Sequence, residues 1–215
     1  MTRKLIIFGA GGHAVSVANV ALSANYEITG FIDANKTGST LLGYPVASSC
    51  ELFGDPLDHV FAIAVGDNYL RNKYFEVVSK KYPEILFPSL IHSTAVVSNF
   101  SSIGSGSVLM PFSLVGPNTA IQKFCIINSN ATIDHDGSMG SFSSLAPGAI
   151  LGGSVSIGER SAISIGAVIK HGTSIGVDTV LGANSYLNID LGDCCIAYGS
   201  PAKVTRHRIA GERYL

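Results

Sequence analysis

The sequence is poor in charged residues and contains no tryptophan. Only 13% of its 215 residues are charged, whereas 47% are hydrophobic. The chain therefore has ample apolar material for a core, and disorder is not expected. The formal net charge is −1. Because no basic excess is present, nucleic acid is a poor candidate for the partner.

Long apolar runs are also missing. No run approaches the ~18 residues of a membrane helix, and the start, "MTRKLIIFGAGGH", lacks the apolar region and cleavage site of a signal peptide. The four cysteines show neither C-x-x-C spacing nor a disulfide framework. We therefore expect a reduced, cytoplasmic protein without membrane insertion. No histidines or cysteines have metal-ligand spacing, so we expect no metal site.

The first part of the chain alternates between strand and helix patterns. Short apolar runs at residues 4–9, 27–33 and 59–67 predict buried parallel strands. Helical spacing follows at residues 13–24 and 69–82, and Asp67 with Asn68 can cap the second helix. The order β-α-β-loop-β-α predicts a small Rossmann-like α/β domain over residues 1–88.

From about residue 91 an aliphatic residue or methionine recurs at every sixth position. The seventeen positions are Ile91, Val97, Ile103, Leu109, Val115, Ile121, Ile127, Ile133, Met139, Leu145, Leu151, Ile157, Ile163, Ile169, Ile175, Leu181 and Leu187. A small residue such as Ser107 or Ala131 stands two places before most of them, and glycine or a small polar residue often follows directly. We interpret the following residue as the one that turns the chain.

A period of six residues is the signature of a hexapeptide β-helix. Its aliphatic residues point into a triangular prism, and three hexapeptides complete one coil. The seventeen repeats make between five and six coils. The sequence thus predicts a β-helix domain with a C-terminal tail over residues 89–215. Wide prism faces with few charges expose apolar area, which favours an oligomer.

A glycine-rich turn joins the first predicted strand to the first predicted helix. Gly9, Gly11 and Ala14 fit G-x-G-x-x-[G/A], and Asp33 follows at the end of the second predicted strand. Such glycines let a pyrophosphate approach a helix N-terminus, while the acid accepts from ribose hydroxyls. About three βα units suit a mononucleotide diphosphate better than NAD. The alternative is that the glycines only allow tight packing of strand against helix.

Two other groups of polar residues are candidates for a site. Gly66, Asp67 and Asn68 follow a strand at the edge where ligands bind in open α/β sheets, although a simple helix cap is the alternative. In "SNATIDHDGSMG", His135 stands between two aspartates just after an inward position. An imidazole with a near-neutral pKa suits a general base, and either Asp134 or Asp136 could orient it.

The whole chain resembles the bacterial nucleotide-sugar acetyltransferases of the sialic-acid and bacillosamine O-/N-acetyltransferase type. The resemblance is carried by the segments "IIFGAGGHA", "GFIDANK", "AVGDN", "INSNATIDHD" and "YGSPAK". It implies a left-handed β-helix, a homotrimer with active sites between subunits, and acetyl-CoA bound along the groove between neighbouring prisms. It also implies that the N-terminal domain holds the nucleotide-linked sugar.

The resemblance assigns roles to residues at three places. It makes His135 the catalytic base, with an adjacent acid (Asp134 or Asp136) and with Asn128 earlier in the same motif. The expected sugar-nucleotide contacts are Gly9, Gly11, Gly12, His13, Asp33, Asn35, Lys36, Gly66, Asp67 and Asn68. The expected acetyl-CoA contacts are Ser144, Gly153, Ile165, Gly166, Ala183 and Lys203. At Ser144 several relatives have a second histidine, so this chain departs from the pattern there.

We therefore expect an acetyl-CoA-dependent N-acetyltransferase that works in the biosynthesis of cell-surface glycans. Its expected substrate is the 4-amino group of a nucleotide-linked 4-amino-4,6-dideoxy sugar, with UDP ahead of dTDP or GDP. Three alternatives stay open at this point: a sialic acid O-acetyltransferase, an NAD-linked enzyme that uses the glycine turn, and a non-catalytic β-helix assembly module.

Overall fold

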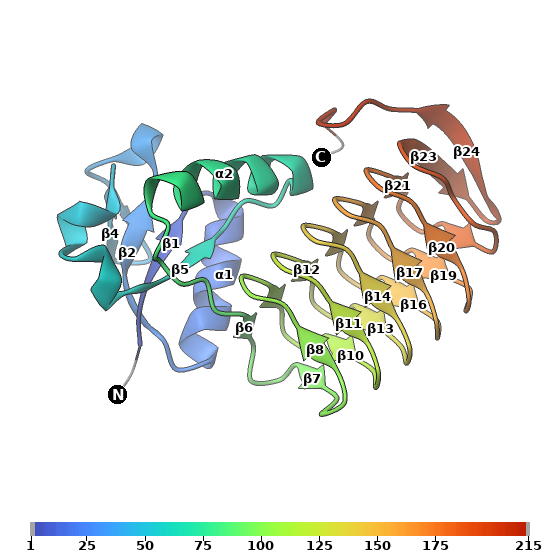
Figure 1. Cartoon of the computed structure of the whole chain (residues 1–215), viewed down its shortest axis with the longest axis horizontal. Coiled ribbons are helices and arrows are strands. Elements are labelled where there is room, and N and C mark those ends of the chain that lie inside the picture. The colour runs from blue at the N-terminus through green and yellow to red at the C-terminus, as the bar shows by residue number, and fades with distance from the viewer. Residues whose placement is uncertain (1–2, 214–215) are drawn as a thin grey trace.

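The structure, a computed structural model, describes residues 3–213 (Figure 1). The two residues at each end, which the expected domains 1–88 and 89–215 include, lie outside the described residues. The fold is the expected one, a small α/β domain followed by a left-handed parallel β-helix. The α/β sheet has the order β3-β4-β2-β1-β5. Its strands are β1 (Lys4–Phe8), β2 (Glu27–Ile32), β3 (Thr40–Leu41), β4 (Tyr44–Ala47) and β5 (Val60–Ile63).

Two helices cover this sheet from opposite sides. Helix α1 (Gly12–Ser23) buries Val17 and Val20, in a cluster that also includes residues of the first β-helix coils. Helix α2 (Asn68–Lys81) is capped at its N-terminus by Asp67, whose carboxylate accepts from the backbone N–H of Leu70 at 2.9 Å. Both helices lie within a residue or two of their predicted ranges. The 3₁₀ turns Ala34–Lys36, Cys50–Phe53 and Pro56–Asp58 and the β3–β4 hairpin occupy the stretch predicted as loop.

Seventeen short strands build the three faces of the prism. The domain-facing face contains β6 (Leu90–Ile91), β9 (Val108–Leu109), β12 (Ile126–Ile127), β15 (Ser144–Leu145), β18 (Ala162–Ile163) and β21 (Val180–Leu181). The apolar face contains β7 (Val96–Val97), β10 (Leu114–Val115), β13 (Thr132–Ile133), β16 (Ile150–Leu151), β19 (Val168–Ile169) and β22 (Tyr186–Leu187). The serine face contains β8 (Ser102–Ile103), β11 (Ala120–Ile121), β14 (Ser138–Met139), β17 (Ser156–Ile157) and β20 (Ser174–Ile175).

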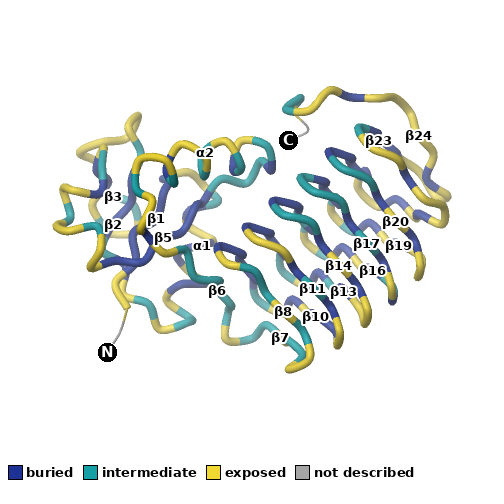
Figure 2. The backbone as a smooth tube through the Cα atoms, viewed as in Figure 1, coloured by how far each residue is buried: buried dark blue, intermediate teal, exposed yellow. Residues whose placement is uncertain are grey.

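The second residue of every one of these strands is an inward position of the predicted repeat. Stacked strands pair in parallel, and each inward residue lies beside the inward residue three hexapeptides further on, as Ile127 lies beside Leu145. Three hexapeptides therefore make one coil. From Leu109 onward all the inward residues are buried, and they form one continuous core (Figure 2). The predicted period and the identity of its inward residues are therefore confirmed.

The prediction for the turning residue was wrong by two positions. Positive φ occurs at the third position after the inward residue, for example at Asn118 (56°) and Asp136 (57°). The glycines that directly follow inward residues are required for a different reason, because the backbones of stacked coils approach closely there. A Cβ on Gly116 would lie 2.8 Å from the carbonyl carbon of Asp134 in the next coil.

The three corners of the prism are named by the faces that they join. The first corner leads from the domain-facing to the apolar face and includes Asn128. The second corner leads from the apolar to the serine face and includes His135. The third corner leads from the serine face back to the domain-facing face and includes Phe124 and Phe142.

The outward residues give the three faces different chemistry. The domain-facing face is buried at both of its ends, for instance at Leu90 and Ile196. The serine face carries small polar side chains. The apolar face carries a ladder of exposed apolar side chains interrupted by Thr132, and its members are Val96, Leu114, Ile150, Val168 and Tyr186. A partner would cover most area on the apolar face.

The chain end returns toward the α/β domain (Figure 1). After the last coil, β23 (Cys195–Gly199) and β24 (Ala202–His207) form an antiparallel hairpin on the domain-facing sheet. The buried Arg208 then donates to the backbone carbonyl of Asp178 at 3.1 Å. A Cβ on Gly211 would lie 2.9 Å from the ring of Tyr69, so the tail packs against helix α2.

Candidate active site

The second corner of the prism holds His135 with both neighbouring acids. Ile133 is fully buried, whereas residues 134, 135 and 136 are all exposed. The positive φ of Asp136 bends the chain, and its Oδ2 lies 2.7 Å from His135 Nδ1. Asp134 instead accepts from the backbone N–H of His135 at 2.8 Å. The structure thus shows which acid bonds to the imidazole, a choice that the sequence left open.

The coils below and above hold this corner in place. One coil below, the Asn118 amide donates to Asp136 Oδ1 at 3.2 Å, and Thr119 Oγ1 donates to the Asp134 carbonyl at 2.8 Å. One coil above, Gly153 leaves room for the imidazole, since a Cβ there would lie 2.6 Å from His135 Nε2. Asn118 was missed in the sequence, although its place exactly one coil before Asp136 is the signal that locates it.

This arrangement raises the pKa of His135 above its usual value. The main cause is the hydrogen bond with Asp136, and the charge of Asp134 adds to it. The same hydrogen bond lowers the pKa of Asp136, with a further contribution from Asn118. Because Nδ1 faces a carboxylate, the neutral ring carries its proton on Nδ1 and leaves Nε2 as the acceptor. The corner therefore presents an oriented base to its surroundings.

The glycine turn divides into a structural part and an open part. Gly9 has a φ of +100°, and a Cβ there would lie 3.0 Å from the carbonyl oxygen of Ala64, so this position needs glycine for packing. At Gly11 and Gly12 an added Cβ would meet nothing within 4 Å. Packing does not explain these two glycines, and the space above them at the start of α1 is free for a ligand.

Asp33 and Lys36 border this open space. The Asp33 carboxylate accepts from the backbone N–H groups of Ala10 at 3.2 Å and Asn35 at 3.0 Å. Lys36 Nζ donates to the Ala10 carbonyl at 2.7 Å. Both side chains therefore shape the glycine turn, and Lys36 adds a positive charge close to the N-terminus of α1, where anions are favoured.

A groove of about 430 Å³ lies between the glycine turn and the domain-facing face of the prism. From the α/β domain it is lined by His13 and Gly66. From the prism it is lined mainly by apolar and small residues, namely Ile126, Asn128, Ser144, Ala146, Pro147, Ala162, Ile163, Ser164, Ile165 and Ala183. The groove thus brings together residues expected at the sugar nucleotide and residues expected at acetyl-CoA.

His13 is neutral in this groove. Burial, together with the nearby Arg71 charge, lowers the pKa of His13 to about 4. Its Nε2 atom is buried and has no hydrogen-bond partner among the described residues. A buried ring nitrogen without a partner is costly. A polar ligand atom in the groove would satisfy it.

Asn68 does not face the groove, contrary to our expectation. Its side chain is fully buried, and Nδ2 donates to the prism carbonyls of Ser161 at 3.0 Å and Arg160 at 3.2 Å. Asp67 serves as the cap of α2, the alternative that the sequence left open. The amide of Asn68 therefore bonds to the backbone of the β-helix and is not available to a ligand. Through these bonds Asn68 connects the Gly66 loop to the prism.

The residues expected at acetyl-CoA are distributed over several places. Ser144, Ile165 and Ala183 line the groove. Gly153 lies beside His135 at the second corner. Gly166 has a φ of +66° at a turn, and Lys203 is exposed on β24. Asn128 lines the groove, and its Nδ2 donates to the Leu145 carbonyl at 2.8 Å.

A single chain does not bring His135 to this groove. The groove lies on the domain-facing face and the first corner, whereas His135 occupies the second corner, which is opposite that face. Neither His135 nor its two acids line the groove. The predicted base and the predicted ligand contacts therefore form two half-sites on separate sides of the prism.

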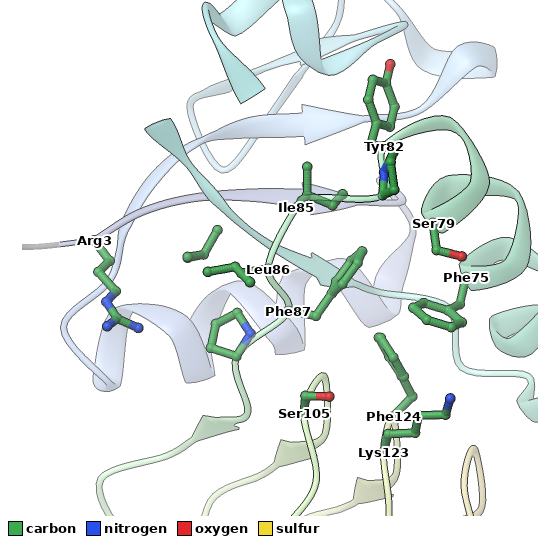
Figure 3. A pocket seen from close by; sticks show the side chains of 13 residues that line it. Arg3, Phe75, Ser79, Tyr82, Ile85, Leu86, Phe87, Ser105, Lys123 and Phe124 are labelled. Atoms are coloured by element: carbon green, nitrogen blue, oxygen red, sulfur yellow. The ribbon is translucent and has the colours of Figure 1, made fainter. Parts of the chain in front are cut away.

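A second hollow, of about 520 Å³, contains none of the predicted site residues (Figure 3). It lies where helix α2 and residues 82–89, which connect the two domains, meet the third corner. Phe75, Phe87 and Phe124 line it, and Phe124 stacks on Phe142 with 5.2 Å between ring centroids. These aromatic rings join the two domains through apolar packing.

The described part of the chain, residues 3–213, offers no cluster of side chains for a metal ion. Nowhere in this range do three or more histidine, cysteine or acidic side chains meet in an arrangement that could hold one. Within the same range no helix has the length and apolar character that crossing a bilayer requires.

Known proteins resemble both parts of the chain. The PglD N-terminal domain model matches residues 4–78. GDP-perosamine N-acetyl transferase from Caulobacter crescentus, solved as a histidine-to-alanine variant in complex with CoA and GDP-perosamine, is 32% identical, with a TM-score of 0.87 over 94% of this chain and 97% of that chain. The acetyltransferase domain of PglB from Neisseria gonorrhoeae, in complex with acetyl coenzyme A, is 34% identical, with a TM-score of 0.87 over 95% and 100%.

A curated relative shows the same resemblance over a shorter range. GDP-perosamine N-acetyltransferase from Escherichia coli is 28% identical over 138 residues, which cover 60% of this chain and 61% of that enzyme. Together these likenesses define the class of the protein, a hexapeptide-repeat acyltransferase. Within that class, the chain belongs to the family of bacterial sugar N-acetyltransferases in which an α/β domain precedes the β-helix.

Proposed function

We propose that the protein transfers the acetyl group of acetyl-CoA to the 4-amino group of a nucleotide-linked 4-amino-4,6-dideoxy sugar, a step in the biosynthesis of cell-surface glycans. The observation that carries this proposal is the oriented His135–Asp136 pair on an exposed corner of an acetyltransferase fold. The amine must lose a proton as it forms the amide with the thioester carbonyl, and an oriented imidazole can accept this proton.

His135 Nε2 accepts this proton as the sugar nitrogen bonds to the acetyl carbon. Asp136 keeps the ring oriented through Nδ1 and favours the imidazolium that results. As the carbon–sulfur bond breaks, the imidazolium returns the proton to the departing thiolate. The products are the N-acetylated sugar and CoA, and His135 is again neutral.

The nucleotide diphosphate would lie over Gly11 and Gly12. The open space at both glycines, the N-terminus of α1 and the Lys36 charge support this position. Among nucleotides, the relatives favour GDP over the UDP that the sequence suggested, because the relatives from Caulobacter crescentus and Escherichia coli act on GDP-perosamine.

The groove beside His13 is our candidate for the arm of acetyl-CoA and the sugar end. Its prism wall is mainly apolar, which suits a pantetheine chain, and the unpartnered His13 nitrogen offers one polar contact. Asn128 and Ser144 add polar groups at the same wall.

We further propose that the active unit is a homotrimer. The apolar face exposes Ile150 by 48% and Val96 by 59% in a single chain, and this face lies directly between the first and second corners. Pairing of prisms around it would bring His135 of one copy toward the groove of the next. The separation of the two half-sites within one chain supports this arrangement.

The experiment is a thiol-release assay with acetyl-CoA and GDP-, UDP- and dTDP-linked 4-amino sugars. We expect release with the GDP-linked sugar and a loss of about 10²–10⁴-fold in kcat for His135→Ala. Absence of release with every sugar nucleotide, or full activity of the His135→Ala variant, would contradict the proposal.

A further inference from the structure

Arg71 is almost completely buried at the junction of the two domains. It lies on helix α2 and is only 1% exposed. Its Nη1 donates to the carbonyls of Val65 and Gly66, each at 2.9 Å. Its Nε and Nη2 donate to the carbonyls of Phe124 and Phe142 in the prism, also at 2.9 Å. One guanidinium thus bonds to the loop beside the groove and to two coils of the β-helix.

Asn68 extends this connection to a third coil. Its Oδ1 accepts from Arg71 Nη2 at 2.7 Å, while its Nδ2 donates to the Arg160 carbonyl at 3.2 Å. Phe124, Phe142 and Arg160 occupy the same place in three successive coils, and all three have a positive φ, of 56°, 61° and 56°. Their carbonyls therefore form a regular row at the third corner, and Arg71 and Asn68 bond along it.

The loop that Arg71 holds borders the groove proposed for the ligands. Gly66 lines the groove, and a Cβ on Gly66 would be 4.0 Å from the His13 ring. A displacement of Gly66 would therefore change the width of the groove beside His13. Lysine in place of Arg71 would keep the charge, but its single ammonium lacks the planar fork that reaches four carbonyls on two sides.

We propose that Arg71 is a positioning residue, which sets the Gly66 loop and His13 at the correct distance from the prism for the sugar nucleotide to bind productively. The proposal rests on the proposed function. Arg71 itself does not line the groove and touches no reacting atom. It acts through the carbonyls of Val65 and Gly66, and Asn68 shares this role.

The test compares Arg71→Lys with wild-type enzyme at a temperature where thermal melting shows both to be folded. We expect the KM for the GDP-linked amino sugar, and the Kd of GDP by calorimetry, to rise by about tenfold, because small misplacements of a binding loop have large effects. We expect the KM for acetyl-CoA to rise by a smaller factor, because most residues that line the groove belong to the prism wall and only His13 and Gly66 come from the α/β domain. The second variant, Asn68→Ser, should shift the same constants in the same direction by a smaller factor.

Arg208→Lys is the matched control, since Arg208 is also buried and donates to a prism carbonyl but holds the C-terminal tail. It should lower the melting temperature and leave both KM values unchanged. Equal changes of both KM values in Arg71→Lys, or unchanged GDP affinity in folded Arg71→Lys and Asn68→Ser, would overturn the positioning role. A wild-type enzyme that releases no thiol would instead contradict the proposed function, and GDP affinity would still test Arg71.

Discussion

A histidine on an exposed corner acts as an effective base only if its ring keeps one orientation. In this protein the orientation depends on a chain of side chains, from Asn118 through Asp136 to His135. Asp134 is held differently, by the backbone N–H of His135, and contributes mainly its charge. We therefore expect different phenotypes when Asp136 and Asp134 are substituted.

Asp136→Asn should change the pH dependence of acetyl transfer. The base must be neutral, so activity falls as the pH drops through the pKa of His135, which lies above its usual value. Loss of the main cause of that increase moves the acidic limb of the kcat profile to lower pH. The plateau should also fall, because the ring loses its orienting carboxylate. Initial rates measured from acidic to mildly alkaline pH report both effects.

Asp134→Asn is the control for this prediction. It removes a neighbouring charge but not the hydrogen bond to Nδ1, so its acidic limb should move less and its plateau should stay closer to wild type. An unchanged acidic limb in Asp136→Asn would show that His135 is not the titrating base.

Gly12→Ala separates ligand binding from packing. Gly12 begins helix α1, and an added Cβ would meet nothing within 4 Å. Alanine favours helix over glycine by up to about 1 kcal/mol, so the free energy of unfolding should stay equal or rise slightly. Calorimetry should nevertheless show weaker GDP binding, because the methyl group occupies the approach of the diphosphate. Gly192→Ala, in equally open space, should leave binding unchanged.

At the scale of the element, the repeat was predictable because one rule governs every coil. The inward side chain and the step of three hexapeptides per coil recur without interruption from Ile91 to Leu187, and a small residue stands at most of the corners. Strand β4 was missed because it is short and contains Pro45. The turning residue was predicted at the wrong position because glycines such as Gly116 are required by the close stacking of the coils and do not have a positive φ.

The site was only partly predictable for a related reason. His135 and the glycine turn are visible as local motifs, and the fold places them where such motifs are expected. The roles of Arg71 and Asn68 depend on carbonyls 53 and 93 residues away, and those distances close only when the domains pack. Sequence spacing carries no signal for such contacts. The choice of Asp136 over Asp134 also needed the backbone conformation of the corner.

Gly116→Ala tests how strictly the stacked coils hold the second corner, where the proposed base His135 lies. The new Cβ would lie 2.8 Å from His135 N, so the corner must move. Overpacking of this kind costs about 1–3 kcal/mol of stability. We expect kcat to fall even at temperatures where the variant is fully folded. In Gly158→Ala a similar clash occurs at the third corner, against the Gly176 carbonyl group. Thermal melting should show a similar loss there, with kcat retained. Equal kcat values in both variants would contradict this coupling.

At the scale of the whole molecule, the apolar face is the feature that a single chain leaves unexplained. Ile150→Lys places a charge in the middle of its exposed ladder. Because Ile150 is half exposed in the single chain, the monomer should lose little stability. Analytical ultracentrifugation should show monomers for this variant and the proposed trimers for the wild type, and the variant should lose most of its acetyl transfer. Ser102→Lys on the serine face should leave both properties unchanged.

The division of the site between copies can be tested by mixing two inactive variants. His135→Ala retains the glycine turn and the groove, whereas Gly12→Asp retains His135 but repels the diphosphate. If His135 of one copy serves the groove of its neighbour, some interfaces in mixed trimers combine both intact halves. After joint refolding, activity should recover to about a quarter of wild type, the share of such interfaces in random trimers. If each chain contains a complete site, the mixture should stay as inactive as its components, because no chain then carries both functional halves.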